Sequence, residues 1–304
     1  MSRGPLEPAR LAIHRSLVRR HIHSVVAGKA DRLNVDLADR DVDPARMLIE
    51  AAASLDRGGV LYTRLEAAVG HPSFANRVID GLGSRHPVVR ARCARIAGAF
   101  QMEQAVPLIA PLLWSNQSLV RNAATRALGV IGGVRSADAL LAAIQRLGPK
   151  PALVVALARA APDLYLETVL SRKQPRGVQP AVATAAGLRR RKSAVAPIVG
   201  QMSDGSPRLR AAGGRALGWI GAPAAIPVLV ECLENTDWRV RLSAAKALGN
   251  IKDFQPGSQM LAACLVDRNA RVRSAAQCAL RRHGRVPNMF AVRGGWRSKI
   301  ASRL

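Results

Sequence analysis

Apolar residues recur at helical spacing along most of the chain, and one stretch shows the pattern clearly. The segment 224–238 carries an apolar stripe made by Ile226, Leu229, Val230 and Leu233. The segment that follows carries a second stripe made by Val240, Ala244, Leu248 and Ile251. Each stripe predicts an amphipathic helix, and Gly249 followed by Asn250 marks the end of the second. We call these two predicted helices A and B, in chain order.

Helix B belongs to a phrase that occurs five times. The copies are VRARCARIAG at 89–98, VRNAATRALG at 120–129, LRAAGGRALG at 209–218, VRLSAAKALG at 240–249 and VRSAAQCAL at 272–280. Where copies are adjacent, their second residue, an arginine, recurs every 31 or 32 residues. A period of that length holds one A–B pair with its turns and predicts a helical solenoid. The gap between the second and third copies has room for two more pairs, expected near 151–160 and 177–190.

An aspartate stands six positions before the repeated arginine in two copies, at Asp204 and Asp267. This motif, together with the phrase LRAAGGRALGWIG, resembles the bacterial HEAT-like repeats named after the phycobilisome lyases. The resemblance implies an all-α fold: a right-handed α-solenoid of about six HEAT-like helix pairs with an N-terminal helical cap. It also implies a structural ladder in which Asp and Arg of neighbouring repeats pair.

The expected members of the ladder are Arg90, Arg121, Arg210, Arg241, Arg273, Asp204 and Asp267. The arginines are expected to tie helix B to an adjacent turn through bidentate hydrogen bonds. In the other copies the aspartate position is held by Ser84, Ser115 and Asn235. The ladder is therefore expected to be incomplete.

The two ends of the chain depart from the repeat, which gives three expected regions: a basic N-terminal helical cap region at 1–70, the solenoid at 71–284 and a basic, flexible tail at 285–304. Within the first region, residues 8–27 form a basic helix whose apolar stripe consists of Leu11, Val18, Ile22 and Val25. This helix is expected to cap the core of the first repeat. The alternative is a helix that lies on an anionic membrane surface.

Charge is the distinctive feature of the composition. The net charge is +26, from 46 basic and 20 acidic residues, which indicates anionic partners and says nothing of the fold. Five positions after the ladder arginines stand Arg95, Arg126, Arg215, Lys246 and Cys278. This position lies between buried layers of helix B and is expected to face solvent, so packing does not require a cation there. Arg95, Arg126, Arg215 and Lys246, here named the cation column, are therefore the predicted partner-binding residues, on the B helices that line the concave face in the family the chain resembles.

These features predict a non-catalytic scaffold that binds an acidic protein partner. The first alternative is sequence-independent nucleic-acid binding through phosphates, to which the cluster RRRK at 189–192 and the tail would contribute. Aromatic residues, at 3 %, are too scarce for extensive base stacking. A peripheral membrane adaptor held by residues 8–27 is the third alternative.

No constellation in the sequence indicates catalysis. The six histidines show no metal-ligand spacing on one helix face. There is no His-Glu dipeptide, whereas deoxyhypusine hydroxylase, an enzyme that resembles these repeats, holds two irons with such pairs. Bilin lyase activity, another family-level alternative, has no identifiable pigment site, and only Trp219, Trp238 and Asp237 could imitate the site of a helical-repeat DNA glycosylase. We expect no metal, no cofactor and no small-molecule substrate.

Two further observations concern the compartment. No apolar stretch approaches the length of a membrane span, and the N-terminus lacks the apolar core of a signal peptide. The four cysteines, Cys93, Cys232, Cys264 and Cys278, lie in predicted helices at positions that other repeats fill with small apolar residues. They are expected to be reduced and packed. The expected location is the cytoplasm, with peripheral attachment to the inner membrane as the alternative.

Overall fold

The computed structural model describes residues 7–172, 174–175, 177–203, 205–252 and 258–284, and all regular structure in these ranges is helical. The chain forms two compact units. Unit 1 comprises residues 1–143 and 159–161, and unit 2 comprises 144–158 and 162–304. The tail predicted at 285–304 lies outside the described residues. No helix among those described is both long enough and apolar enough to span a membrane.

Unit 1 begins with three helices that precede the repeats: α1 (Glu7–Val26), α2 (Pro44–Ala53) and α3 (Val60–Gly70). Two A–B pairs follow. They are α4 (Pro72–Leu82) with α5 (Pro87–Ala99), and the broken helix η1 (Glu103–Ala105), α6 (Val106–Ile109) and η2 (Ala110–Trp114) with α7 (Ser118–Ile131). Helices α8 (Gly133–Leu147) and α9 (Pro151–Ala160) form the pair in which the division between the units falls.

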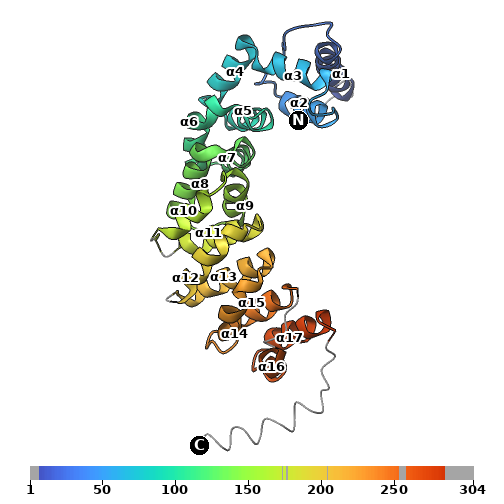
Figure 1. Cartoon of the computed structure of the whole chain (residues 1–304). Helices are drawn as coiled ribbons and strands as arrows, with labels where there is room; N and C mark the ends of the chain where they lie inside the picture. The colour runs from blue at the N-terminus through green and yellow to red at the C-terminus, as the bar shows by residue number, and fades with distance from the viewer. Residues whose placement is uncertain (1–6, 173, 176, 204, 253–257, 285–304) are drawn as a thin grey trace, which may run out of the picture. The chain divides into compact units, whose positions relative to one another are not determined.

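Unit 2 continues with four more pairs (Figure 1). These are α10 (Tyr165–Ser171) with α11 (Val178–Leu188), η3 (Lys192–Ala194) and α12 (Val195–Ser203) with α13 (Pro207–Ile220), η4 (Pro223–Ala225) and α14 (Ile226–Cys232) with α15 (Trp238–Leu248), and α16 (Ser258–Ala263) and η5 (Cys264–Val266) with α17 (Ala270–Arg282). The described residues thus contain seven pairs, one more than the approximate count from the sequence, and α9 and α11 fill the gap between the clear copies.

Proline and polar caps fix where the B helices begin. Proline occupies the first turn of α5 and α13, where its missing N–H removes no helical hydrogen bond. The Asp237 side chain accepts a hydrogen bond from the Arg239 amide at the start of α15, and Asn269 does the same for Arg271 at the start of α17. The chain therefore enters each of these helices at a defined residue.

The B helices of each unit pack on one another through a seam of glycine against alanine. In unit 1, α5 packs on α7, and in unit 2, α11, α13, α15 and α17 pack in succession. A Cβ atom added at the seam glycine would lie 2.5–2.8 Å from the next helix, at the pairs Gly98–Ala127, Gly187–Ala216, Gly218–Ala247 and Gly249–Ala279. The glycines that close three of the phrases, Gly98, Gly218 and Gly249, are therefore required for close helix packing and not only as end signals. Gly187 has the same role in α11.

The seam predicts a large penalty for one added methyl group. Gly218→Ala would place its Cβ 2.6 Å from the Ala247 Cα, so α13 and α15 must separate, at a cost of about 1–3 kcal/mol. We expect a lower melting temperature by circular dichroism. The matched control is Gly200→Ala in α12, where a Cβ meets nothing within 4 Å and alanine improves helix propensity. Equal melting temperatures for the two variants would contradict the seam.

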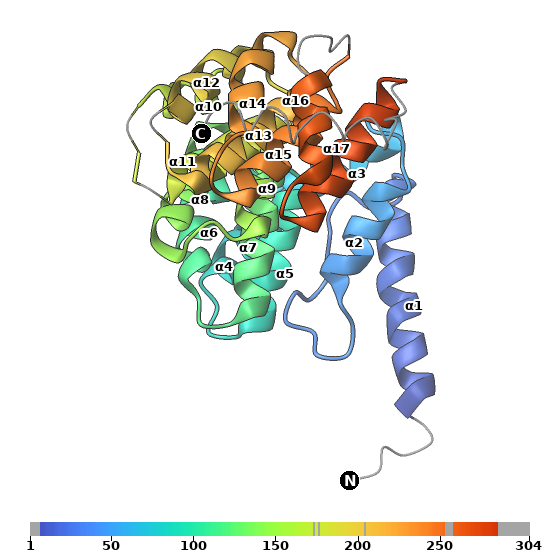
Figure 2. The ribbon, with the colours of Figure 1, turned by 90° about the horizontal axis from the view of Figure 1, so that it is seen from below.

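The N-terminal helices of unit 1 pack on the first repeat. Ile22 and Val25 of α1 are each 2 % exposed, and α1 contacts α2 and α3. Helix α2 lies between α1 and α5 (Figure 2). The stripe predicted for residues 8–27 is thus buried towards the C-terminal end of α1.

Residues 31–43, here named the strap, connect α1 to α2 and are held by two arginines of the first repeat. Arg77 donates to the backbone oxygens of Leu33 and Val35, at 2.5 and 3.3 Å. Arg92, which is 6 % exposed, donates to three strap carbonyls, those of Leu37, Asp39 and Val42. A buried guanidinium is stable here because the strap carbonyls replace its water.

Candidate partner-binding surface

The repeated arginines bind the turn that precedes their own B helix. Their side-chain nitrogens donate to backbone oxygens five to eight residues earlier, at 2.6–3.2 Å, in the pairings Arg90 with Ser84 and Arg85, Arg121 with Ser115, Arg210 with Met202 and Ser203, Arg241 with Asn235 and Thr236, and Arg273 with Asp267 and Arg268. These oxygens belong to the last turn of helix A or the A–B turn and have no helical partner of their own. Each arginine thus fastens helix B to the end of helix A.

One ladder arginine also crosses to the next repeat. Arg241 donates from Nε and Nη2 to the two carboxylate oxygens of Asp267, at 2.7 and 2.9 Å. The hydrogen bond from Arg241 is the main reason that the pKa of Asp267 lies below its usual 3.8. Asp204 lies outside the described residues. Asn235, at the position where the motif has Asp, contributes its backbone oxygen to Arg241.

Removing Arg241 should cost stability. Arg241→Ala leaves the mostly buried Asp267 carboxylate without its ion-pair partner, with the Asn269 amide still donating to Oδ1, and leaves the two turn carbonyls without the arginine donor. We expect a loss of about 3 kcal/mol. We expect the melting temperature to fall by about 5 °C or more. Arg268→Ala, which removes an exposed side chain directly after Asp267 in the sequence, is the control. An unchanged melt for Arg241→Ala would show that the ladder is not structural.

The Arg241–Asp267 pair also makes the stability of the fold depend on pH in the acid range. Because folding lowers the pKa of Asp267, its contribution is present above the unfolded pKa of 3.8 and is lost as pH falls through the lower folded value. The melting temperature of Asp267→Asn should therefore fall less than that of the wild type when the pH is lowered from about 5 to about 3. Asp80→Asn, at an exposed position, should behave as the wild type does. Parallel acid profiles for the wild type and Asp267→Asn would refute the linkage.

The cation column divides between the units. In unit 1, Arg95 lies on α5 and Arg126 on the adjacent α7; in unit 2, Arg215 lies on α13 and Lys246 on the adjacent α15. Arg126, Arg215 and Lys246 are exposed. Desolvation by surrounding protein lowers the pKa of Arg215, but a guanidinium stays charged in any protein environment.

Arg95 differs from the other members because it already holds an anion. Its Nη2 lies 2.6 Å from Oδ2 of Asp43, at the end of the strap, and both side chains are one-third exposed. Burial alone would raise the pKa of Asp43, but hydrogen bonds from Arg95 and the Arg46 amide, with the charges of Arg95 and Arg92, outweigh burial and lower it. The expectation that Arg95 faces solvent freely is therefore wrong, because the strap supplies a carboxylate to it.

A second row of cations in unit 2 was not anticipated from the sequence. Arg208, Arg239 and Arg271 stand seven positions before Arg215, Lys246 and Cys278, so they lie on the same helix face two turns earlier. All three are exposed, and we name them the N-terminal row. The guanidiniums of Arg239 and Arg271 lie over the Trp238 ring at 5.1 and 5.7 Å. In unit 1 the same register holds Val88 and Leu119, so counting back seven positions in the sequence could have found this difference.

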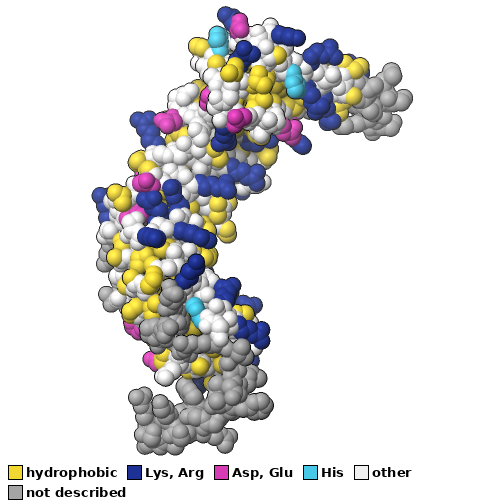
Figure 3. Space-filling model, turned by 45° about the vertical axis from the view of Figure 1, so that its right-hand side comes forward, with side chains coloured by type: hydrophobic (Ala, Val, Ile, Leu, Met, Phe, Trp, Pro, Cys, Tyr) yellow, Lys and Arg dark blue, Asp and Glu magenta, His cyan; other side chains and the backbone are white. Residues whose placement is uncertain are grey.

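Each unit has a groove beside these residues. In unit 2 a groove of about 790 Å³ is lined by α15 and α17, with Lys246, Arg271 and Arg282 around the apolar Leu242 and Ala275. In unit 1 a groove of about 280 Å³ is lined by α2, α3, α5 and α7 and includes Arg95 and Arg126. Among the residues that the structure describes, no acidic one lines either groove. Figure 3 shows a face on which Lys and Arg outnumber Asp and Glu.

A family model of HEAT repeats matches residues 75–158, 165–241 and 215–281, more than half of the chain. The chain belongs to the HEAT-repeat family. The search of curated proteins found no match.

Several solved structures are similar to this HEAT-repeat chain. Human deoxyhypusine hydroxylase in complex with glycerol is 19 % identical, with 92 % of this chain and 99 % of that chain covered and a TM-score of 0.35. An engineered protein is 20 % identical, with coverages of 87 % and 78 % and a TM-score of 0.40. The CpcE–CpcF complex of phycocyanin lyase from Nostoc is 22 % identical, with coverages of 67 % and 74 % and a TM-score of 0.32.

The residues considered for glycosylase chemistry have structural partners in these HEAT repeats. Asp237 caps α15 through the Arg239 amide at 2.7 Å. Trp238 is half-buried beneath two arginines. Trp219 is 37 % exposed at the end of α13 and lies against Gly187 of α11.

The RRRK cluster lies after the B helix α11, as expected, but is not merely solvated. Arg191 binds Asp163 at 2.5 Å and Glu167 at 3.1 Å. Burial would raise the pKa of Glu167, but the hydrogen bond from Ser193 and the hydrogen bond and charge of Arg191 lower it. This arginine therefore joins the turn to helix α10.

Three of the four cysteines pack as expected. Cys93, Cys232 and Cys264 are buried, and burial raises the pKa of the Cys93 thiol to about 12 and that of the other two to about 11. Cys278 is exposed, which corrects the expectation that it packs. It occupies the solvent-facing register of the cation column, so α17 presents a thiol where the preceding B helix presents Lys246.

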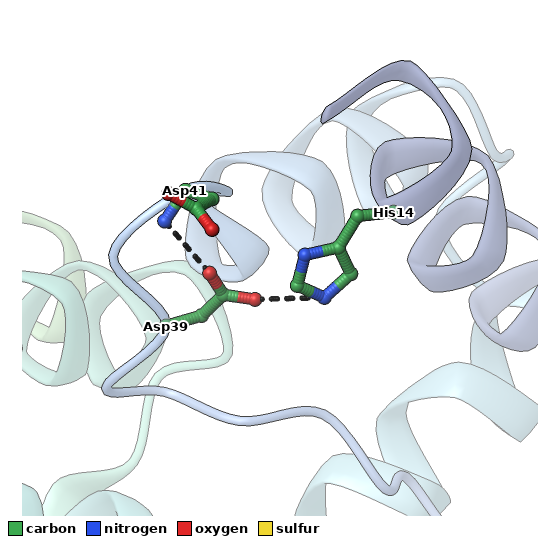
Figure 4. Close-up of side chains that lie close together, drawn as sticks. All are labelled: His14, Asp39 and Asp41. Atoms are coloured by element: carbon green, nitrogen blue, oxygen red, sulfur yellow. Dashed lines mark hydrogen bonds and ion pairs between the residues drawn. The ribbon is translucent and has the colours of Figure 1, made fainter. Parts of the chain in front are cut away.

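The strap brings together one group that spacing on a helix could not reveal. His14 of α1 lies beside Asp39 and Asp41, and ligand atoms of all three lie within 4.8 Å of one another (Figure 4). His14 Nε2 is 3.0 Å from Asp39 Oδ2, while Asp39 Oδ1 accepts the amides of Asp41 and Val42. Imidazole and carboxylate are groups that zinc accepts, but both Asp39 oxygens are engaged. The group helps to attach α1 to the strap, as does His21 of α1, whose Nε2 accepts the Asn34 amide at 2.9 Å.

Proposed function

We propose that this HEAT-repeat protein is a non-catalytic scaffold that binds an acidic protein partner along the B-helix face of its units. The observation that carries the proposal is the pair of Arg95 and Asp43. There, a cation at the column register binds a carboxylate from an acidic segment of the chain itself. The strap thus provides an internal example of the contact proposed for the partner.

The remaining column cations have the properties that such binding requires. Arg126, Arg215 and Lys246 are exposed. None of the described residues that line the groove next to Arg126 or the groove next to Lys246 is acidic. With a net charge of +26, the protein would attract an acidic partner from a distance, which raises the association rate more than the final affinity.

Nucleic acid is the second candidate, and the N-terminal row of unit 2 favours it. Arg208, Arg239 and Arg271 add three cations to the two column cations, Arg215 and Lys246, on one face of three successive B helices. A sugar–phosphate backbone, which is charged at every nucleotide, could contact both sets without sequence preference.

The test compares two probes by fluorescence anisotropy: a labelled short poly-L-glutamate and a labelled short DNA duplex, each at about 50 and 200 mM salt. The column variant carries Arg126→Glu, Arg215→Glu and Lys246→Glu; Arg95 is kept because it holds Asp43. Its matched control carries Arg85→Glu, Arg135→Glu and Arg268→Glu, which change three exposed cations at other positions.

The scaffold proposal predicts that the column variant weakens poly-L-glutamate binding about tenfold or more and that the control variant weakens it about twofold or less. Equal weakening by both variants would mean that net charge alone binds the peptide, and would contradict the proposal. If the duplex binds more tightly than the peptide at about 200 mM salt and depends on the column, the nucleic-acid candidate replaces it.

A further inference from the structure

The groove of unit 1 combines an apolar interior with cations at its edge. Its lining includes the small, buried residues Gly98, Ala123 and Ala127 and the larger apolar residues Ile49 and Val130. It is open to solvent on one side, since Val130 is 41 % exposed. We name it the anchor groove.

The anchor groove is hollow because of the seam between the B helices. A side chain at Gly98 would lie 2.7 Å from the Ala127 Cα, so α5 and α7 can approach closely only if the residues at their contact are small. The same small residues fill little of the space between α7 and the N-terminal helix α2. Packing between the helices thus leaves apolar surface that the unit itself does not cover.

Arginines at the edge of the groove give it a preference for acidic ligands. Arg57, after α2, and Arg126, on α7, are exposed and both line the groove. Arg95 lines it as well but is bound to Asp43 at 2.6 Å. Two cations are thus available to a ligand, and no acidic residue competes with it among the described residues of the lining.

The size of the groove limits what it can hold. At about 280 Å³ it lies just below the range of about 300–1,000 Å³ typical of pockets that enclose a small-molecule ligand. One or two apolar side chains of a peptide fit this volume better than a complete cofactor.

We propose that the anchor groove binds an apolar side chain, such as leucine, from an acidic segment of the partner protein, with flanking carboxylates on Arg57 and Arg126. This inference rests on the proposed scaffold function and states the chemistry of its partner: an acidic peptide with an apolar anchor. It also separates unit 1 from unit 2, whose face carries arginine where α5 and α7 carry Val88 and Leu119.

The experiment uses two labelled peptides of equal length and equal negative charge. Both are glutamate-rich; one has a central Leu-Leu pair and the other has Ser-Ser in its place. The full-length protein should bind the leucine peptide at least tenfold more tightly, because the groove removes leucine from water. Replacing both Arg57 and Arg126 with glutamine should weaken binding of the leucine peptide.

Two variants test whether the preference for the leucine peptide comes from the anchor groove. Ala53→Trp, at an exposed position that lines the groove, should fill it and reduce the preference for leucine to about twofold or less. Ala67→Trp, at an exposed position of α3 outside the lining, should keep the full preference. Val130→Ser removes part of the apolar wall and should lower the preference too, which keeps the test decisive if Ala53→Trp does not fold.

Equal affinity of the wild type for both peptides would overturn the anchor groove, and so would a preference that Ala53→Trp and Val130→Ser leave intact. If both peptides bind equally and the column variant weakens both, the scaffold proposal stands and only the groove assignment fails. If neither peptide binds at about 200 mM salt, the scaffold proposal fails together with it.

Discussion

The close approach of successive B helices, glycine against alanine, is the constraint on which the other features depend. It fixes the residues at the contact as small, since a Cβ at Gly98, Gly187, Gly218 or Gly249 would overlap the next helix. Dispersion contacts over such a flat seam need both backbones at short range. The ladder arginines hold that geometry by fastening α5, α7, α13, α15 and α17 to the turns before them.

The seam also determines where on the B helices polar and charged side chains can lie. With the inner faces of the B helices committed to small residues, the position between the buried layers is left to solvent. At this register Arg126, Arg215, Lys246 and Cys278 are exposed. Packing of one B helix on the next does not require a cation at this register, and the scaffold proposal assigns the recurring cations to binding. In unit 1 the strap already provides an anion for one of these cations, because the Asp43 carboxylate binds Arg95.

The helical repeats and their period could be predicted from the sequence because five of the B helices each carry an apolar stripe and the repeated arginine. The pairs around α9 and α11 were expected from the gap they had to fill, not from a motif. The roles of Arg77 and Arg92 could not be predicted, because their acceptors are backbone carbonyls of a strap more than 40 residues away in sequence. Local patterns do not encode such long-range contacts. The N-terminal row, by contrast, lies at a fixed offset from the column and was available to a more complete alignment of the copies.

The claim that the B-helix cations bind an acidic partner can be tested most directly by chemical protection of arginines. The protein would be treated with phenylglyoxal, an arginine-directed reagent, with and without the leucine-containing acidic peptide, and modified residues would be located by mass spectrometry. The account predicts protection of Arg126, with no protection of the exposed Arg135 on the A helix α8 or of Arg268 in the turn before α17. Uniform protection, or protection of Arg135 and Arg268 without Arg126, would contradict it.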